Sequence, residues 1–226
     1  MKIEMVIFDM AGTTINEDNI VYKTLQKAIN NFGVEVDLHG VLAIGAGQEK
    51  LNAIKDIVKV YGSDTDIAKS EDIFKSFISM LDTAYHAYPI TAMPNAASVL
   101  MELRKKNILV VLNTGYDKKT AQFILEKINW NQYEHFDLLV TASDVKNSRP
   151  APDMIEYAMN KFSLMDTKNI IKVGDSKIDI EEGKNANCLY SIGITTGAQN
   201  LEQLKEANPD YIIHNLSELI GILNLN

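Results

Sequence analysis

Short apolar runs that alternate with helical segments constrain the fold of this chain more than any other feature of its sequence. Such runs occupy 108–112, 136–140 and 169–173, and each lies next to a segment of helical periodicity. Runs this short are typical of strands buried on both faces of a parallel sheet. Because strands joined through helices pair in parallel, the pattern predicts an α/β fold with a doubly wound, mostly parallel sheet. The other expected elements are a first strand ending at Asp9, final strands at 189–192 and 211–213, and helices at 96–106, 118–128 and 152–162.

A block without strands separates the first strand from the others. Between Ile15 and Tyr88 apolar residues recur at helical spacing, and no segment there favours a strand. The expected helices of this block cover 20–32, 51–61 and 73–85. We therefore expect an α/β core made of residues 1–14 and 89–226 and an inserted helical domain, residues 15–88. An insertion at this point should lie over the carboxyl edge of the sheet and act as a lid.

Composition and charge exclude several classes of protein. The 226 residues are 46% hydrophobic, which is enough to bury a full core. The formal charge of −8 argues against nucleic-acid binding, because that function requires a basic face. No stretch approaches the roughly 18 apolar residues that cross a bilayer, and Met1-Lys2-Ile3-Glu4 does not resemble a signal peptide. The one cysteine, Cys188, fits a reducing compartment, so we expect a cytoplasmic protein that binds neither nucleic acid nor membranes.

Small polar residues follow three of the predicted strands. They are Asp9, Thr114-Gly115 and Asp175-Ser176. The carboxyl ends of parallel strands meet at one edge of the sheet, where such folds bind their ligands. Asp9 and Asp175 offer the hard oxygen ligands that Mg²⁺ prefers. Asp179 follows Asp175 by four residues, so both are expected on one side of the next helical turn, although capping of that helix is an alternative role for them.

Two further features fit an anionic ligand at this edge. Gly12 permits a tight turn after Asp9, so that backbone N–H groups there can face an anion. Arg149 lies in a loop that two prolines stiffen, and a guanidinium held in this way suits a phosphoryl group. Taken singly, an ordinary turn at Gly12 and a surface arginine at position 149 would explain the same residues.

Four motifs together resemble those of the haloacid dehalogenase superfamily, in that family's order and at plausible spacings. They are Phe8-Asp9-x-x-Gly12-Thr13, Asn113-Thr114-Gly115, Arg149-Pro150-x-Pro152 and Gly174-Asp175-Ser176-x-x-Asp179. The resemblance covers nearly the whole chain and implies a Rossmann-like core with an inserted helical cap. It also implies a Mg²⁺-dependent hydrolase that acts on a small phosphorylated or phosphonate metabolite. We expect a monomer or homodimer.

The resemblance also implies roles for individual residues. Asp9 would be the nucleophile that forms an aspartyl-phosphate intermediate, Thr114 would bind phosphoryl oxygens, and Arg149 would stabilise charge. The implied metal-binding set is Asp9, the backbone carbonyl of Ala11, Asp175 and Asp179, the last as a ligand or as a partner of one. The implied substrate-binding residues are Gly12, Thr13, Gly115 and Tyr116.

Ala11 is the departure that points to a subgroup. Phosphatases of this superfamily usually carry an aspartate there, as the general acid and base. The chain instead resembles the phosphonoacetaldehyde hydrolase (phosphonatase)-like members of the superfamily in three motifs: Asp-x-Ala-Gly-Thr-Thr, Arg149 and Thr114-Gly115-Tyr116. Those enzymes use a cap lysine to form a Schiff base with an aldehyde, so that C–P cleavage leaves an enamine. Lys50, in Gly47-Gln48-Glu49-Lys50, matches that lysine, although a solvated lysine at a helix start is the alternative.

Other positions depart from the phosphonatase pattern. Ala53, Ala46 and Asn19 stand where phosphonatases have a histidine, a methionine and a cysteine near the aldehyde. The leading hypothesis is therefore a phosphonatase-like hydrolase whose substrate the sequence does not name. The alternatives are a phosphate monoester phosphatase of the same fold and a non-catalytic module that binds phosphate and Mg²⁺.

Overall fold

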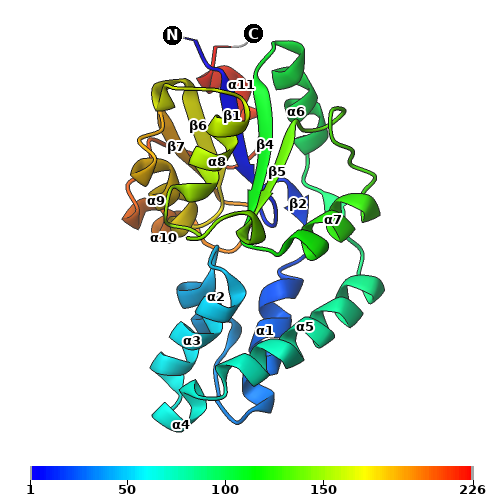
Figure 1. The fold of residues 1–226 in the computed structure, drawn as a ribbon, viewed down its shortest axis with the longest axis vertical. Helices are drawn as coiled ribbons and strands as arrows, with labels where there is room; N and C mark the ends of the chain where they lie inside the picture. Colours follow the sequence, from blue (N-terminus) through cyan, green and yellow to red (C-terminus); the bar gives the residue numbers. More distant parts are fainter. Residues whose placement is uncertain (1, 225–226) are drawn as a thin grey trace.

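A six-stranded parallel sheet forms the centre of the computed structural model, which describes residues 2–224 (Figure 1). The strand order is β5-β4-β1-β6-β7-β8, and every neighbouring pair is parallel. The strands are β1 (Met5–Asp9), β4 (Leu109–Thr114), β5 (Leu138–Thr141), β6 (Ile170–Gly174), β7 (Tyr190–Ile194) and β8 (Tyr211–Ile213). The predicted α/β class is confirmed. Since the chain builds outward from β1 in both directions, the carboxyl end of β1 lies at the topological switch point, where such sheets bind ligands.

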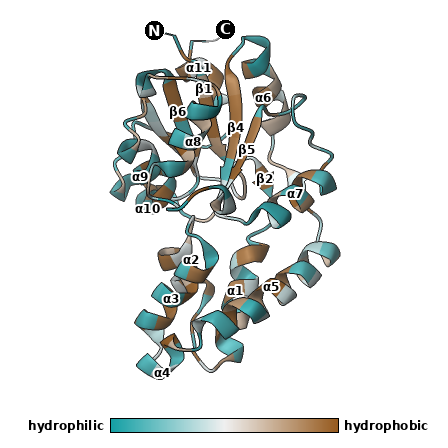
Figure 2. Cartoon of the chain, viewed as in Figure 1, coloured by the Kyte–Doolittle hydropathy of each residue, from teal (hydrophilic) through white to brown (hydrophobic). Residues whose placement is uncertain are grey.

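Helices cover both faces of this sheet because side chains alternate along each strand. In β1, Met5 and Ile7 pack in one apolar cluster with Met154 of α8, whereas Val6 and Phe8 pack in another with residues of α6 and α7. Figure 2 shows the strands as the most hydrophobic part of the ribbon. The elements around the sheet are α6 (Ala96–Lys105), α7 (Lys118–Lys127), η1 (Ala142–Asp144), α8 (Asp153–Lys161), η2 (Thr167–Asn169), α9 (Lys177–Asn185), α10 (Leu201–Glu206) and α11 (Glu218–Ile222).

Five helices form a separate layer at the carboxyl end of the strands, opposite the two chain termini (Figure 1). They are α1 (Ile20–Asn31), α2 (Leu38–Gly45), α3 (Lys50–Tyr61), α4 (Asp64–Ile67) and α5 (Ser70–Ala87). Their apolar stripes face inward, so Leu25 and Ile29 of α1 share a core with Ile54 of α3 and Phe77 of α5. Helices therefore occupy most of residues 15–88, the block in which the sequence favoured no strand.

Helix α2 was not predicted from the sequence. Its apolar residues do not follow a single stripe, and it contains Gly40 and Gly45, which lower helix propensity. Asp37 stabilises its start by accepting a hydrogen bond from the N–H of Gly40 at 2.7 Å. Gly45 allows α2 to lie against α3, because a Cβ there would come within 3.2 Å of the Ala53 Cβ. Packing against α3 thus compensates for a weak local signal.

The two chain crossings between the helical layer and the sheet are paired with each other. β2 (Ile15–Asn16) and β3 (Thr91–Ala92) form a short antiparallel ladder, and the N–H of Met93 donates to the Thr14 carbonyl at 2.9 Å. The expectation of no strand between Ile15 and Tyr88 is wrong at this point, because a two-residue strand with a distant partner leaves no periodicity to detect. Over residues 2–224, no helix combines the length and apolar character that a membrane crossing requires.

Candidate active site

Asp9 lies at the carboxyl end of β1, between β4 and β6, with only 6% of its surface exposed. Most residues predicted for the site line one small cavity with it. The lining residues are Asp9, Ala11, Tyr22, Gly47, Lys50, Thr114, Gly115, Tyr116, Arg149 and Asp175. The cavity therefore combines the ends of β1 and β4 with the start of α3, and sequence positions more than a hundred residues apart meet there.

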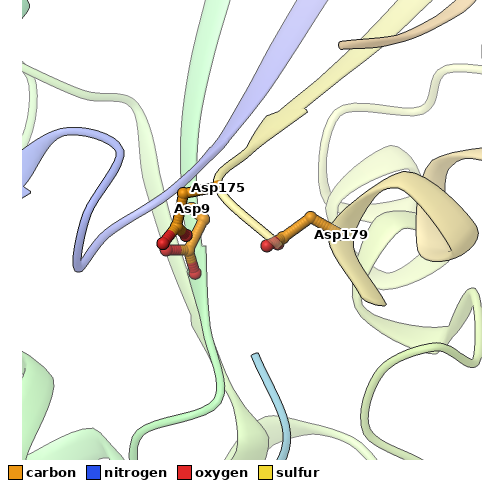
Figure 3. A group of neighbouring side chains, drawn as sticks. All are labelled: Asp9, Asp175 and Asp179. Carbon is orange, nitrogen blue, oxygen red and sulfur yellow. The ribbon is translucent and has the colours of Figure 1, made fainter. Parts of the chain in front are cut away.

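Three buried carboxylates lie close enough together to hold a metal ion. One oxygen from each of Asp9, Asp175 and Asp179 lies within 4.8 Å of the others. Figure 3 shows the carboxylates of Asp9 and Asp175 side by side, with Asp179 reaching toward them from the start of α9. Hard oxygen donors of this kind fit Mg²⁺ or another hard divalent cation.

Asp175 differs from Asp9 and Asp179 in its surroundings, since those two carboxylates form ion pairs with Arg149. Its oxygens accept hydrogen bonds from the N–H of Ala198 at 2.5 Å and from the Thr13 hydroxyl at 3.5 Å. Among residues 2–224, no lysine or arginine forms an ion pair with it. Burial and the neighbouring carboxylate of Asp9 raise the pKa of Asp175 well above its usual range. The positive charge of a divalent cation beside Asp175 would oppose that shift and favour the ionised carboxylate.

Two glycines allow the backbone to approach Asp175 closely. Gly12 has a positive φ of 81°, and a Cβ on it would lie 2.4 Å from an Asp175 oxygen. At Gly197 the corresponding distance would be 2.0 Å. Any side chain at either position would displace the carboxylate, so the sequence needs glycine on both sides of it. Gly12 was predicted to belong to the site, whereas Gly197 was not.

Arg149 links the carboxylates on the opposite side of Asp9. Its guanidinium donates to Asp9 and to Asp179, each at 2.7 Å, and to the backbone carbonyl of Asn113 at 2.8 Å. The side chain is almost fully buried. Burial opposes the ionisation of Asp179, but Arg149 and Lys172 together lower its pKa below the usual range. Asp179 is therefore an ionised partner of two cations, and it leaves Asp9 and Asp175 as the carboxylates that face the cavity.

One geometric expectation for this region is wrong. Asp175 and Asp179 do not share a helix face, because α9 begins at Lys177 and Asp175 lies in the loop before it. Ser176 is the N-cap residue, and its hydroxyl donates to the Asp179 carboxylate. The two aspartates approach each other across the turn, since the loop directs Asp175 back toward β1.

Sequence reasoning missed Lys172, Glu182 and the side chain of Asn113. Lys172 is fully buried in β6, and its ammonium lies 2.8 Å from Asp179, 3.2 Å from Glu182 and 2.7 Å from the Asn113 side-chain oxygen. The signal was a lysine within the apolar run Ile-Ile-Lys-Val, where an unpaired charge would be costly. In this network two cations, Arg149 and Lys172, face four carboxylates, and one added divalent cation would balance them.

Lys50 is the first residue of α3 and points into the cavity that contains Asp9. Its ammonium donates to the Gln48 carbonyl at 2.6 Å and lies 5.3 Å from the ring centre of Tyr22 and 5.7 Å from that of Tyr116. Only 7% of the residue is exposed. Burial, assisted by the charge of Arg149, lowers the pKa of Lys50 to about 8. The amine is therefore neutral in a sizeable fraction of molecules at mildly alkaline pH.

Glycines also allow the helical layer to rest directly on the loops of the sheet. A Cβ on Gly115 would lie 3.0 Å from the Gln48 carbonyl oxygen, and one on Gly47 would lie 2.4 Å from the Ser176 hydroxyl. The loop before α3 thus lies directly against the loops after β4 and β6. This contact brings Lys50 to the cavity that Asp9 also lines.

An apolar cavity of about 160 Å³ adjoins the site behind Lys50 and Tyr116. Phe74, Phe77, Ile78 and Leu81 of α5 form one wall, and Gly115 to Asp117 form part of the other. Since Lys50, Gly115 and Tyr116 also line the cavity of Asp9, the two spaces share a wall. This space was not predicted, because helices and loops far apart in the chain enclose it.

Comparisons with known proteins bear on the family to which the sequence motifs belong. A family model described as haloacid dehalogenase-like hydrolase matches residues 6–192, which confirms the resemblance inferred from the motifs. A phosphonoacetaldehyde hydrolase of Latilactobacillus sakei is 30% identical, and the match covers 98% of this chain and 95% of that protein. A phosphonoacetaldehyde hydrolase of Bacillus cereus (strain B4264) is 28% identical, with 91% of this chain and 81% of that protein covered.

Solved structures share the fold. A phosphonoacetaldehyde hydrolase-like protein of Oleispira antarctica superposes with a TM-score of 0.84 at 21% identity, over 99% of this chain and 92% of that one. A predicted phosphoglycolate phosphatase of Haemophilus somnus 129PT gives a TM-score of 0.78 at 21% identity, over 99% of both chains. At this level of identity the structural matches establish the fold alone.

Proposed function

Because this chain belongs to the haloacid dehalogenase-like hydrolases, we propose that it is a phosphonatase-like, Mg²⁺-dependent enzyme that cleaves the C–P bond of a small phosphonate aldehyde. The observation that carries this proposal is the placement of a buried lysine, Lys50, in the same cavity as Asp9, in a chain with alanine at position 11. The names of the L. sakei and B. cereus relatives support the substrate class.

The chemistry assigned to Lys50 and Asp9 compensates for the missing acid. The neutral amine of Lys50 adds to the aldehyde carbon and water leaves, which gives a protonated imine. An Asp9 oxygen then attacks phosphorus, the C–P bond breaks, and its electron pair enters the imine to form an enamine. No leaving oxygen has to be protonated in that step. Water finally hydrolyses the aspartyl phosphate and, after protonation of the enamine carbon, the imine.

Other residues bind and orient the phosphoryl group. Arg149, 2.7 Å from Asp9, holds that carboxylate toward the cavity, and its positive charge offsets the charge of an incoming phosphonate. Thr114, Gly12, Thr13 and Gly115 would supply hydroxyl and N–H donors, and Tyr116 would border the organic part of the substrate. Mg²⁺, held by Asp9, the Ala11 carbonyl and Asp175 with Asp179 beside them, would neutralise phosphoryl charge.

The helical layer acts as a lid in this proposal. Residues 15–88 would move relative to a core made of residues 1–14 and 89–226, with the paired strands β2 and β3 at the junction. Closure would bring Lys50 to the aldehyde and exclude water from Asp9.

Borohydride trapping tests the role of Lys50. With phosphonoacetaldehyde and Mg²⁺ present, borohydride should reduce the imine and leave a covalent adduct on Lys50, detectable by peptide mass spectrometry. Asp9→Asn should still form the adduct but release no phosphate, because the amide cannot attack phosphorus. Lys50→Arg should lose both adduct and turnover. Lys55→Arg, an exposed lysine on the same helix, is the matched control and should keep both.

A phosphate monoester phosphatase is the second candidate. Ala46, Ala53 and Asn19 depart from the phosphonatase aldehyde pocket, and this observation favours a different organic group. Such an enzyme would keep Asp9 and Mg²⁺ but need Lys50 only for its charge, so Lys50→Arg would retain most activity on its ester substrate. A non-catalytic phosphate-binding module would show binding without turnover on either substrate class.

A further inference from the structure

Glu17, Tyr85 and Tyr116 form a chain of buried hydrogen bonds beside Lys50 that the chemistry above does not use. The Tyr85 hydroxyl lies 3.2 Å from a Glu17 carboxylate oxygen and 2.8 Å from the Tyr116 hydroxyl. The three residues are between 2% and 5% exposed. They come from the junction after β2, from α5 and from the loop after β4, so the chain is complete only when the helical layer rests on the sheet.

Glu17 is buried, and among residues 2–224 no lysine or arginine forms an ion pair with it. Its carboxylate accepts a hydrogen bond from the N–H of Val21 at 3.0 Å. The charges of Lys50 and Lys23 also lower the pKa of Glu17, but neither lysine contacts the carboxylate as an ion pair. Burial outweighs these favourable contacts and raises the pKa of Glu17 to about 8. The carboxyl group therefore keeps its proton at neutral pH, although it belongs to a residue type that is normally ionised.

We propose that Glu17, Tyr85 and Tyr116 form a proton relay that serves the reacting centre beside Lys50, in place of the acid absent at Ala11. This inference rests on the proposed function and adds to it a source for the proton. Tyr116 is the end of the relay that meets the substrate, because it lines the cavity of Asp9 and Lys50. Glu17 and Tyr85 act through it.

The relay balances the protons of imine formation. When the neutral Lys50 amine adds to the aldehyde, one proton passes from nitrogen to oxygen. The hydroxyl group formed in this way leaves as water only after it receives a second proton. Tyr116 donates that proton, Tyr85 replaces it, and Glu17 replaces the proton of Tyr85 and becomes a carboxylate. Hydrolysis of the product imine reverses the sequence and returns the proton to Glu17.

A purely structural role for Glu17 is the competing explanation, since its carboxylate also accepts from the first turn of α1. Two variants separate the explanations. Glu17→Gln keeps an oxygen that can accept from Val21 but has no proton to release. Tyr85→Phe keeps the ring and removes the hydroxyl that connects the other two. Glu35→Gln and Tyr88→Phe, at exposed positions, are the matched controls.

The pH profile of kcat is the decisive measurement. Wild-type activity should rise as Lys50 becomes neutral and fall as Glu17 loses its proton, giving a bell with a maximum near pH 8. Glu17→Gln and Tyr85→Phe should each lower kcat at least about tenfold and lose the alkaline limb, with little change in KM. Both control variants should keep the bell. An alkaline limb that survives in Glu17→Gln and Tyr85→Phe would overturn the relay.

Infrared spectroscopy gives a test that needs no substrate. With ¹³C-labelled glutamate, the difference between wild type and Glu17→Gln should contain the band of a protonated carboxyl at pH 7, lost above pH 8. Absence of that band at pH 6 would overturn the relay. If Glu17→Gln fails to fold, the difference between wild type at pH 6 and wild type at about pH 9.5 gives the same readout. The borohydride and pH experiments together distinguish failure of the relay from failure of the proposed function. If Lys50 forms no adduct but the alkaline limb of the pH profile on an ester substrate depends on Glu17, the proposed imine chemistry is wrong and the relay stands. If the adduct forms and the limb is independent of Glu17, the relay fails and the proposed function stands.

Discussion

The two sides of the cavity treat buried charge in opposite ways. On the core side, Arg149 and Lys172 contact Asp179 at 2.7 and 2.8 Å, and the pKa of Asp179 falls below its usual range despite burial. On the side of the helical layer, neither Glu17 nor Lys50 forms an ion pair within the described part of the chain, and burial brings the pKa of each to about 8. Burial opposes charge on both sides of the cavity, so a buried group stays ionised where cations contact it and becomes neutral near pH 8 where burial is not offset.

The two kinds of group suit different chemical roles. Fixed charges that do not titrate near neutral pH are suited to orienting Asp9 and a phosphoryl group. Groups with pKa values of about 8 are suited to proton transfer, because near neutral pH they gain or lose a proton with only a small change in free energy. The helical layer thus brings two groups with pKa values of about 8 to a sheet edge where Arg149 and Lys172 keep Asp179 ionised.

Breaking the core network should have the largest effect on stability. Lys172→Met removes one of two cations and leaves Asp179 and Glu182 with an uncompensated buried charge. The free energy of unfolding should fall by about 3–5 kcal/mol, measured by urea denaturation. Lys75→Met, which breaks the exposed pair with Asp72, should change it by less than about 1 kcal/mol. Equal effects of the two substitutions would contradict the contrast between paired buried charges and exposed ones.

The effect of Glu17 on stability should depend on pH. The folded protein keeps the Glu17 proton up to about pH 8, whereas the unfolded chain releases it near the ordinary glutamate pKa of 4.5. Stability from this group is therefore fully present below pH 4.5 and is lost as pH rises toward 8. Relative to wild type, Glu17→Gln should gain about 3 kcal/mol between pH 5 and pH 8, measured by denaturation at each pH. A difference that does not change with pH would show that Glu17 is ionised in the folded protein.

A smaller effect should come from the metal. Mg²⁺ at about one hundred times its dissociation constant should raise the free energy of unfolding by about 2–3 kcal/mol, because it offsets the charge of Asp9 and Asp175. Asp175→Asn should remove most of this gain. Asp210→Asn, a carboxylate that accepts from the N–H of Ser191 outside the cavity, should retain it. Thermal melts with and without Mg²⁺ measure both, and an equal gain in Asp175→Asn would place the ion elsewhere.

Much of the fold followed from local patterns. Apolar runs and helical stripes identified the six strands of the sheet and most helices, because burial on two faces or one dictates those periodicities. The polar strand ends identified Asp9, Thr114 and Asp175, since parallel strands bring their carboxyl ends together. The short ladder of β2 with β3 and the glycine-containing helix α2 were missed, because both depend on partners that the local sequence does not specify.

The sequence by itself determined the sheet, the position of the helical insertion and the residues at the carboxyl edge. Tertiary structure alone decided which side chains contact each buried charged group. The hydrogen-bonded residues Glu17 and Tyr85 are 68 positions apart in the sequence, and Lys172 and Asn113 are 59 apart. No spacing or motif in the sequence predicts either contact. A strand or helix records its environment in a repeating pattern of residues. A hydrogen bond between distant segments depends on where packing sets two side chains, and that position belongs to the folded chain as a whole.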